Sequence, residues 1–245
     1  MTGTHDAAGV WHEPFEVPFR DTDREGHVKL SVWLAWLAEL AGDDYEARGA
    51  GRDALIRQGQ VFLIRQFALQ VYRAPALYDT LEARTWEHGT QAVFFRRHYA
   101  FDTPDGARAA DARSTWLLCD PVNHRILRPK ALAEPVRNID APNDCPDPSD
   151  LILPEEAPVL GERKILFTDL DANRHVYCAN YGNIIMDHLP ETYVRHPFSF
   201  FEITYVKEAL AGETLTLRGM DTPEGFIMAG LHTDGSVSFI SKMRL

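Results

Sequence analysis

The chain contains an internal repeat, which restricts its fold more than any other feature of the sequence. Residues 19–28 (FRDTDREGHV) align with residues 167–176 (FTDLDANRHV) at an offset of 148, and five of the ten positions are identical. Further along, residues 78–81 (YDTL) resemble residues 212–215 (GETL) at an offset of 134, so the second copy is 14 residues shorter. Two similar units in one chain predict a covalent pseudo-dimer with sites at the seam between them.

A proline-rich, acidic segment separates the two copies. Residues 129–160 contain seven of the fifteen prolines, and residues 131–160 carry seven acidic side chains against one basic side chain. Proline lacks a backbone donor and disfavours helix in the residue before it, so this segment is expected to be an extended linker. We therefore predict an N-terminal domain over residues 10–130, a linker over 131–160 and a C-terminal domain over 161–245.

Each copy is predicted to hold a helix followed by antiparallel strands, which is an α+β fold. Residues 31–41 place apolar side chains at spacings of three and four, and Ser31 is the expected N-cap. A shorter counterpart spans residues 180–189, before Pro190. Strand-like runs follow at 61–64, 67–72, 80–86, 92–101 and 112–118, and again at 200–206, 214–217, 226–231 and 237–243. Each helix can bury its apolar face by lying across such a sheet.

Charge and cysteine content exclude several classes of protein. With 25 basic and 36 acidic residues, the net charge is −11, so no nucleic-acid partner is expected. Three cysteines far apart in the sequence fit neither a disulfide framework nor a zinc site. The sequence has no secretory signal pattern and no run of 18 apolar residues. These features predict a cytoplasmic protein with no membrane span.

The strongest chemical signal lies in the second copy of the repeat. Asp171, Asn173 and His175 are spaced two residues apart, so an extended segment would direct all three side chains to one side. The first copy has Asp23, Glu25 and His27 at these positions. Aligning the second match of the repeat places Glu208 opposite Ala74, so the second copy alone combines all four groups. This set suits the hydrolysis of an acyl compound, although an Asp-x-Asn-x-His segment also occurs as a capping loop.

These motifs resemble those of the acyl-acyl-carrier-protein (acyl-ACP) thioesterases of plants and bacteria. That family carries Asp-Leu-Asp-x-Asn-x-His-Val in its second domain, followed about thirty residues later by Tyr-x-x-Glu-Cys. The chain reads DLDANRHV over residues 169–176 and YVKEA over residues 205–209. Residues 73–75 (RAP), 85–86 (TW), 96–97 (RR) and 114–116 (STW) are similar to first-domain features, and the resemblance covers about residues 15–245.

The resemblance implies two tandem hot-dog domains that release free fatty acid from acyl-ACP without a metal or another cofactor. It implies that His175 and Glu208 activate water, that Asn173 positions or polarises the thioester carbonyl, and that Asp171 supports the group. The family's cysteine is replaced by Ala209 here, which excludes a thiolate at that position. Cys178, three residues after His175, leaves a Cys–His nucleophile as an alternative.

The resemblance further implies that the interior of the first domain receives the acyl chain. The candidate lining residues, for which core packing is the alternative, are Trp33, Trp36, Leu37, Leu40, Phe62, Phe94 and Trp116. Arg125, Arg128 and Lys130 are the candidate docking surface for the acidic carrier protein, and a solvated charged face is the alternative there.

Three other functions remain open at this point. The first is an acyl-coenzyme A thioesterase that acts on an aliphatic, aryl or polyketide thioester. A non-catalytic binder of acyl thioesters is a second possibility, and a dehydratase a third. A homodimer is possible.

Overall fold

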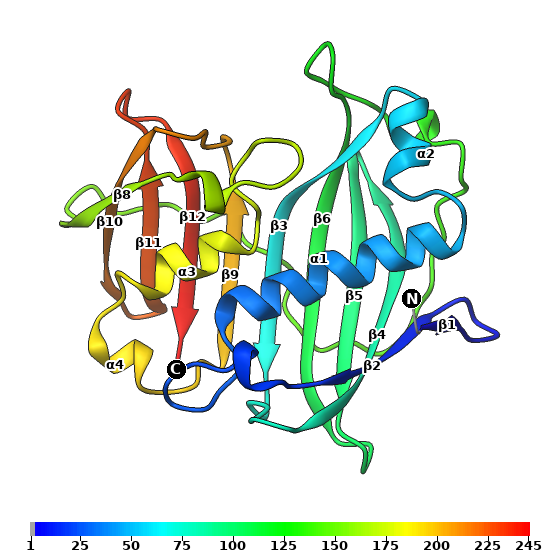
Figure 1. Cartoon of the computed structure of the whole chain (residues 1–245), viewed down its shortest axis with the longest axis horizontal. Coiled ribbons are helices and arrows are strands. Elements are labelled where there is room, and N and C mark those ends of the chain that lie inside the picture. Colours follow the sequence, from blue (N-terminus) through cyan, green and yellow to red (C-terminus); the bar gives the residue numbers. More distant parts are fainter. Residues whose placement is uncertain (1–2) are drawn as a thin grey trace.

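A computed structural model describes residues 3–245 and shows one antiparallel sheet of 12 strands that spans both copies of the repeat (Figure 1). The strand order is β1-β2-β4-β5-β6-β3-β9-β12-β11-β10-β8, with β7 paired to β6. The first half holds β1 (Thr4–His5), β2 (Trp11–Glu16), β3 (Val61–Val71), β4 (Thr80–Gln91), β5 (Phe94–Asp102), β6 (Arg108–Asp120) and β7 (Arg125–Ile126). The second half holds β8 (Val159–Lys164), β9 (Phe200–Tyr205), β10 (Thr214–Thr222), β11 (Gly225–Leu231) and β12 (Val237–Arg244).

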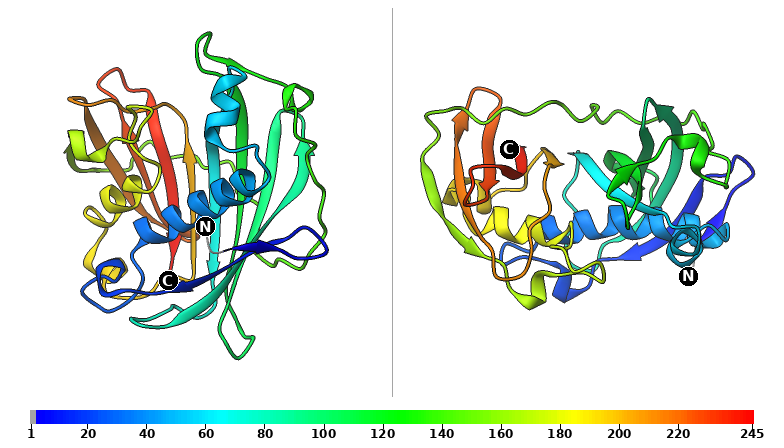
Figure 2. Two further views of the ribbon diagram at one scale, coloured as in Figure 1. Left: turned by 45° about the vertical axis from the view of Figure 1, so that its right-hand side comes forward. Right: turned by 90° about the horizontal axis from the view of Figure 1, so that it is seen from above.

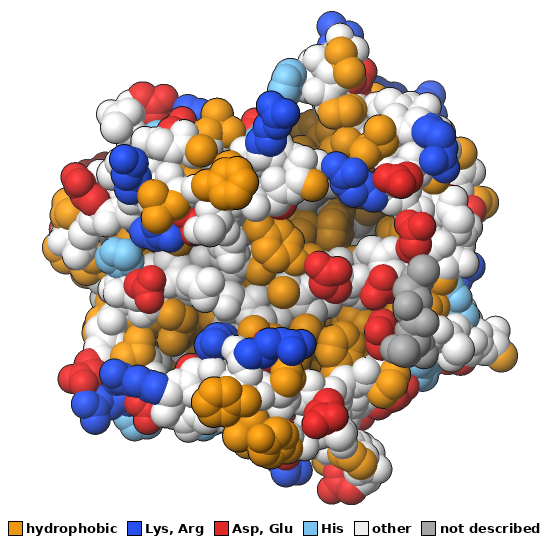
Figure 3. Space-filling model, in the orientation of Figure 1, with side chains coloured by type: hydrophobic (Ala, Val, Ile, Leu, Met, Phe, Trp, Pro, Cys, Tyr) orange, Lys and Arg blue, Asp and Glu red, His pale blue; other side chains and the backbone are white. Residues whose placement is uncertain are grey.

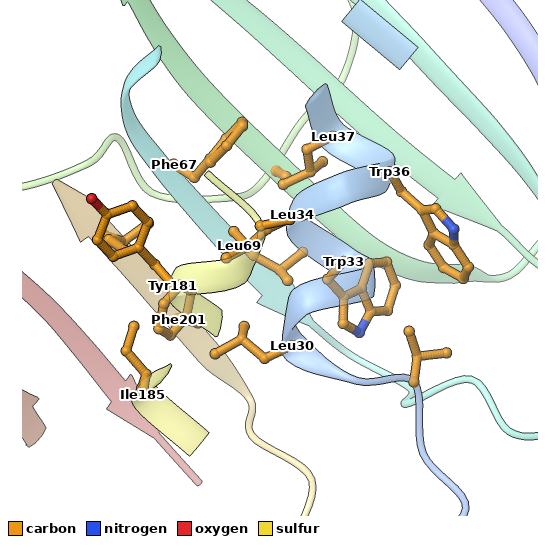
Figure 4. Packing of buried hydrophobic residues seen from close by; sticks show 14 of the residues in the cluster. Leu30, Trp33, Leu34, Trp36, Leu37, Phe67, Leu69, Tyr181, Ile185 and Phe201 are labelled. Atoms are coloured by element: carbon orange, nitrogen blue, oxygen red, sulfur yellow. The ribbon is translucent and has the colours of Figure 1, made fainter. Parts of the chain in front are cut away.

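The helices lie on one face of this sheet. They are α1 (Leu30–Ala47) and α2 (Arg52–Arg57) in the first half and α3 (Asn180–Met186) and α4 (Glu191–Val194) in the second. The apolar side chains of α1 recur every three or four residues and point at the sheet, where Trp33, Leu34 and Leu37 are buried (Figure 4). Each half is thus a helix packed on antiparallel strands, and the predicted α+β tandem architecture is confirmed.

The two halves join where β3 pairs with β9, and their helices meet beside this seam. Residues 66–70 of β3 pair with residues 200–204 of β9 in antiparallel register. Gly182 of α3 lies against the start of α1, because a Cβ atom there would come within 2.7 Å of the Ser31 nitrogen and 3.1 Å of the Leu30 carbonyl carbon. This position therefore requires a residue without a side chain.

The proline-rich segment crosses the opposite face of the sheet. Between Ala131 and Val159 the chain forms no helix and no strand, and it runs from one half to the other behind the strands (Figure 2). Asn143 donates to the carbonyl of Tyr99 at 2.8 Å, and the hydroxyl of Ser149 donates to the buried carboxylate of Glu202 at 2.9 Å. The segment is thus fixed to the sheet along its path.

The predicted boundaries of several elements were wrong. The helix begins at Leu30, and its N-cap is Lys29 rather than Ser31. The runs 61–64 and 67–72 form one strand, β3, whose register against β6 shifts between Ile64 and Gln66. The strand predicted over 80–86 continues to Gln91. Among residues 3–245, no helix is both long and apolar enough to cross a lipid bilayer.

Candidate active site

The loop that carries the Asp-x-Asn-x-His motif is a tight turn rather than the extended segment that we predicted. Leu170 and Val176 form a bridge, and the Asp171 carboxylate accepts the backbone N–H groups of Asn173 at 2.8 Å and His175 at 3.4 Å. Arg174 has a φ of +67°, in the left-handed region. Asp171 therefore shapes the loop, and its hydrogen bonds with His175 are to the backbone.

This turn brings His175 against Glu208. His175 pairs with Leu210 in an isolated bridge, and the N–H of Val176 donates to the carbonyl of Ala209 at 3.1 Å. The segment after β9 is thereby held beside the motif. As a result, Nε2 of His175 lies 2.6 Å from a carboxylate oxygen of Glu208, and both side chains are partly open to solvent. Because a carboxylate can only accept, Nε2 carries the hydrogen of this contact, and in the neutral imidazole Nδ1 then has the lone pair.

The first half has the same turn but no carboxylate that corresponds to Glu208. Asp23 accepts the N–H groups of Glu25 at 2.9 Å and His27 at 3.1 Å, and His27 pairs with Ala76 as His175 pairs with Leu210. By this register Ala74 occupies the position of Glu208. The cavity beside His27 has a volume of about 30 Å³, which leaves no room for an acyl group. The repeat therefore forms one site with a paired histidine.

A cavity of about 190 Å³ lies in the first half and reaches the motif of the second half. Its walls come from α1, α2 and strands β3–β6, and Asn173 is the residue that the second half contributes. Arg52, at the start of α2, donates from Nη2 to Oδ1 of Asn173 at 3.0 Å and also lines the cavity. The space-filling view shows a hollow with hydrophobic side chains inside and charged side chains at its rim (Figure 3).

The residues expected to contact the acyl chain divide into two groups. Phe62 and Trp116 line the cavity. Trp33, Trp36, Leu37 and Leu40 pack in the main core instead, where the ring of Trp33 lies 5.1 Å from that of Phe101. Phe94 does not line the cavity but its neighbour Phe95 does, because adjacent strand residues point to opposite faces.

A buried network of charged groups forms part of the cavity wall. Tyr45, Glu87 and Arg97 line the cavity. The Tyr45 hydroxyl donates to Glu87, and Arg97 donates to Asp44 at 2.6 Å. Burial and the nearby carboxylate of Glu87 raise the pKa of Tyr45 well above its usual range, so its hydroxyl stays protonated. Burial opposes ionisation of Asp44, but Arg97 and Arg48 outweigh it and hold the pKa of Asp44 below its usual value.

Comparisons with known proteins show the family to which the chain belongs. Residues 9–133 match the acyl-ACP thioesterase N-terminal domain, and residues 155–234 match the C-terminal domain of that family. The chain belongs to the acyl-ACP thioesterase family. Comparison with curated protein sequences gives no match.

Two solved structures share the whole fold of this thioesterase. One is an acyl-ACP thioesterase from Bacteroides thetaiotaomicron, with a TM-score of 0.87 at 21% identity over 96% of this chain and 97% of that one. The other is the 12:0-ACP thioesterase from Umbellularia californica, with a TM-score of 0.80 at 17% identity over 99% and 98% of the two chains. The tandem hot-dog architecture implied by the sequence is therefore confirmed.

The one cysteine near the motif of this thioesterase is not positioned as a nucleophile. Cys178 packs against the main core, and burial raises the pKa of its thiol to about 12. At neutral pH the side chain is a thiol, which is a weak nucleophile. Among residues 3–245, no group of three or more His, Cys, Asp and Glu side chains is arranged to hold a metal ion.

The candidate carrier-docking residues lie at the surface beside the cavity wall. Arg125 is in β7, and Arg128 and Lys130 follow it; all three are exposed. Directly after Lys130, the carbonyl of Ala131 accepts a hydrogen bond of 2.8 Å from the side chain of Gln60, which lines the cavity. The three cations thus belong to the half of this enzyme that holds the cavity.

Proposed function

We propose that this acyl-ACP thioesterase binds the acyl chain in its first half and hydrolyses the thioester with the motif of its second half. The linker over residues 131–160 joins the two domains. In this mechanism Nδ1 of His175 takes a proton from water as the water oxygen attacks the thioester carbonyl carbon. The Glu208 carboxylate accepts the hydrogen bond from Nε2 throughout and stabilises the imidazolium that forms.

The remaining steps follow from the position of Asn173. Its side-chain N–H groups stabilise the negative charge on the carbonyl oxygen of the tetrahedral intermediate. When the intermediate collapses, the carbon–sulfur bond breaks and the proton on His175 passes to the leaving sulfur. The products are a free fatty acid and the thiol of ACP. Asp171 holds the turn through the backbone of Asn173 and His175.

The His175–Glu208 contact is the observation that carries this proposal. It pairs His175, the proposed base, with the carboxylate of Glu208. His175 lies two residues after Asn173, whose side chain reaches the acyl cavity. The equivalent turn of the first half has His27, but Ala74 stands at the position of Glu208. A binding protein needs no such pair, so the contact favours catalysis over simple binding.

Replacing either member of the pair tests the mechanism. His175→Ala and Glu208→Gln should each lower kcat by about a hundredfold or more, because general-base catalysis typically contributes that much. Thiol release from acyl-ACP is the measurement. His27→Ala is the matched control, since it removes the corresponding histidine of the other copy, and it should leave kcat unchanged. Wild-type kcat in both His175→Ala and Glu208→Gln would falsify the assignment.

The choice of carrier is tested separately. Charge reversal at Arg125, Arg128 and Lys130 should raise KM for acyl-ACP, because the carrier is acidic, and leave kcat unchanged. Hydrolysis of the same acyl group on a small thiol should not change, since no carrier docks. An unchanged KM for acyl-ACP excludes this docking surface. Equal kcat/KM values for acyl-ACP and acyl-coenzyme A in the wild type would show that the enzyme does not select its carrier.

A further inference from the structure

We propose that Arg52 of the first half is a positioning residue for Asn173 of the second half, which rests on the proposed role of Asn173. The two residues are 121 positions apart, and no motif links them. The guanidinium Nη2 donates to Oδ1 of Asn173 at 3.0 Å, and both residues line the acyl cavity. The contact therefore lies where the acyl cavity of one half meets the catalytic loop of the other.

The chemistry of the arginine determines which way the amide points. A guanidinium has five donors and no acceptor, so the atom of Asn173 that faces it must be the oxygen. The amide nitrogen then points away from Arg52. Within its own loop, the Asn173 side chain makes one long contact, from Nδ2 to the Asp171 carboxylate at 3.4 Å. Without Arg52, little else would hold the amide in this orientation.

The same hydrogen bond makes the amide a better donor. The positive charge of Arg52 beside Oδ1 draws electron density from the Asn173 amide, and consecutive hydrogen bonds polarise one another. The Nδ2–H groups are therefore stronger donors to a developing oxyanion when Arg52 is in place. The nearest carboxylate, that of Asp53, lies 4.0 Å from Nη1 of Arg52 and leaves Nη2 for Asn173.

Variants of the arginine test the proposal on a substrate that needs no carrier. With an acyl-N-acetylcysteamine thioester, Arg52→Met should lower kcat by about tenfold and change KM less than twofold, because the lost contact acts on the transition state. Arg52→Lys keeps a donor and should recover part of the rate. Arg57→Met is the control, since Arg57 is the last residue of the same helix, is also exposed and does not line the cavity. Melting temperatures should not differ among the variants, since Arg52 itself is largely exposed.

A double-mutant cycle separates positioning from an independent effect. If Arg52 acts through Asn173, Arg52→Met should lower kcat in the wild type but not in an Asn173→Ala background. A tenfold loss in both backgrounds overturns the inference, and so does an unchanged kcat of Arg52→Met beside an impaired Asn173→Ala. Full activity of Asn173→Ala by itself refutes the proposed role of Asn173, and the inference with it.

Discussion

We predict the length of acyl chain that this enzyme hydrolyses best from the volume of the cavity, which is the proposed acyl site. An apolar cavity of about 150 Å³ holds benzene, which has six carbons. By proportion, the cavity of about 190 Å³ holds about eight carbons. The charged network of Tyr45, Glu87 and Arg97 forms part of the cavity wall, and hydrogen bonds hold these groups in place.

Kinetics across saturated acyl-ACP substrates from butanoyl to hexadecanoyl measure this limit. Each methylene that enters the cavity contributes about 0.8 kcal/mol, or about a fourfold gain in kcat/KM. We expect kcat/KM to rise at this rate up to octanoyl and then to fall, because longer chains exceed the volume of the cavity.

Enlarging the cavity should move this optimum. Phe62→Ala removes a ring from the wall, and the space of a phenyl group admits at most about six further carbons. The optimum should therefore move toward dodecanoyl and no further than about tetradecanoyl. Phe94→Ala is the matched control, because Phe94 points to the other face of the same sheet, and its optimum should stay at octanoyl. A wild-type optimum at hexadecanoyl, or an unmoved optimum in Phe62→Ala, refutes the reasoning from volume.

Three further predictions concern reactivity and stability. Cys178→Ala should keep kcat within about twofold, and iodoacetamide at pH 8 should not inactivate the enzyme, because the thiol pKa is about 12. Gly182→Ala should lower the melting temperature, since its Cβ meets the backbone of α1. Gly42→Ala in α1 is the control: its Cβ meets no atom within 4 Å, and it should stabilise the helix by about 1 kcal/mol. Burial, helped by nearby His88, lowers the pKa of His98 to about 3, so between pH 6.5 and 3 the unfolded chain binds a proton that the folded protein does not. Stability should fall on acidification, by about 2 kcal/mol at pH 5, and a urea titration should show a smaller fall in His98→Phe.

The sequence predicted those features that depend on local spacing. The repeat at an offset of 148 residues identified the two halves, and the structure gives both copies the same turn, with Asp23 and Asp171 accepting equivalent N–H groups. The alignment of Glu208 with Ala74 agrees with the register of the His175 and His27 bridges.

The errors have physical reasons. The two-residue spacing of the polar side chains in the motif predicts an extended segment. In the structure the Asp171 carboxylate instead accepts backbone N–H groups and closes a turn. Phe94 and Phe95 are equivalent by composition, and the register of β5 alone decides which one faces the cavity. The Arg52–Asn173 contact could not be predicted, because it depends on how α2 of one half meets a loop of the other.

The pairing of β3 with β9 within one chain allows the two halves to differ, so that one of them carries the site. Separated halves would expose open strand edges with Phe67 and Phe201 beside them, and such edges invite self-pairing and aggregation. Fusion into one chain raises the effective concentration of the correct partner edge above that of any other. In a symmetric homodimer every substitution appears in both copies. Here the two halves have different sequences and always pair with each other. Ala74 can therefore differ from Glu208 without removing the second copy's carboxylate, and each half is free to specialise.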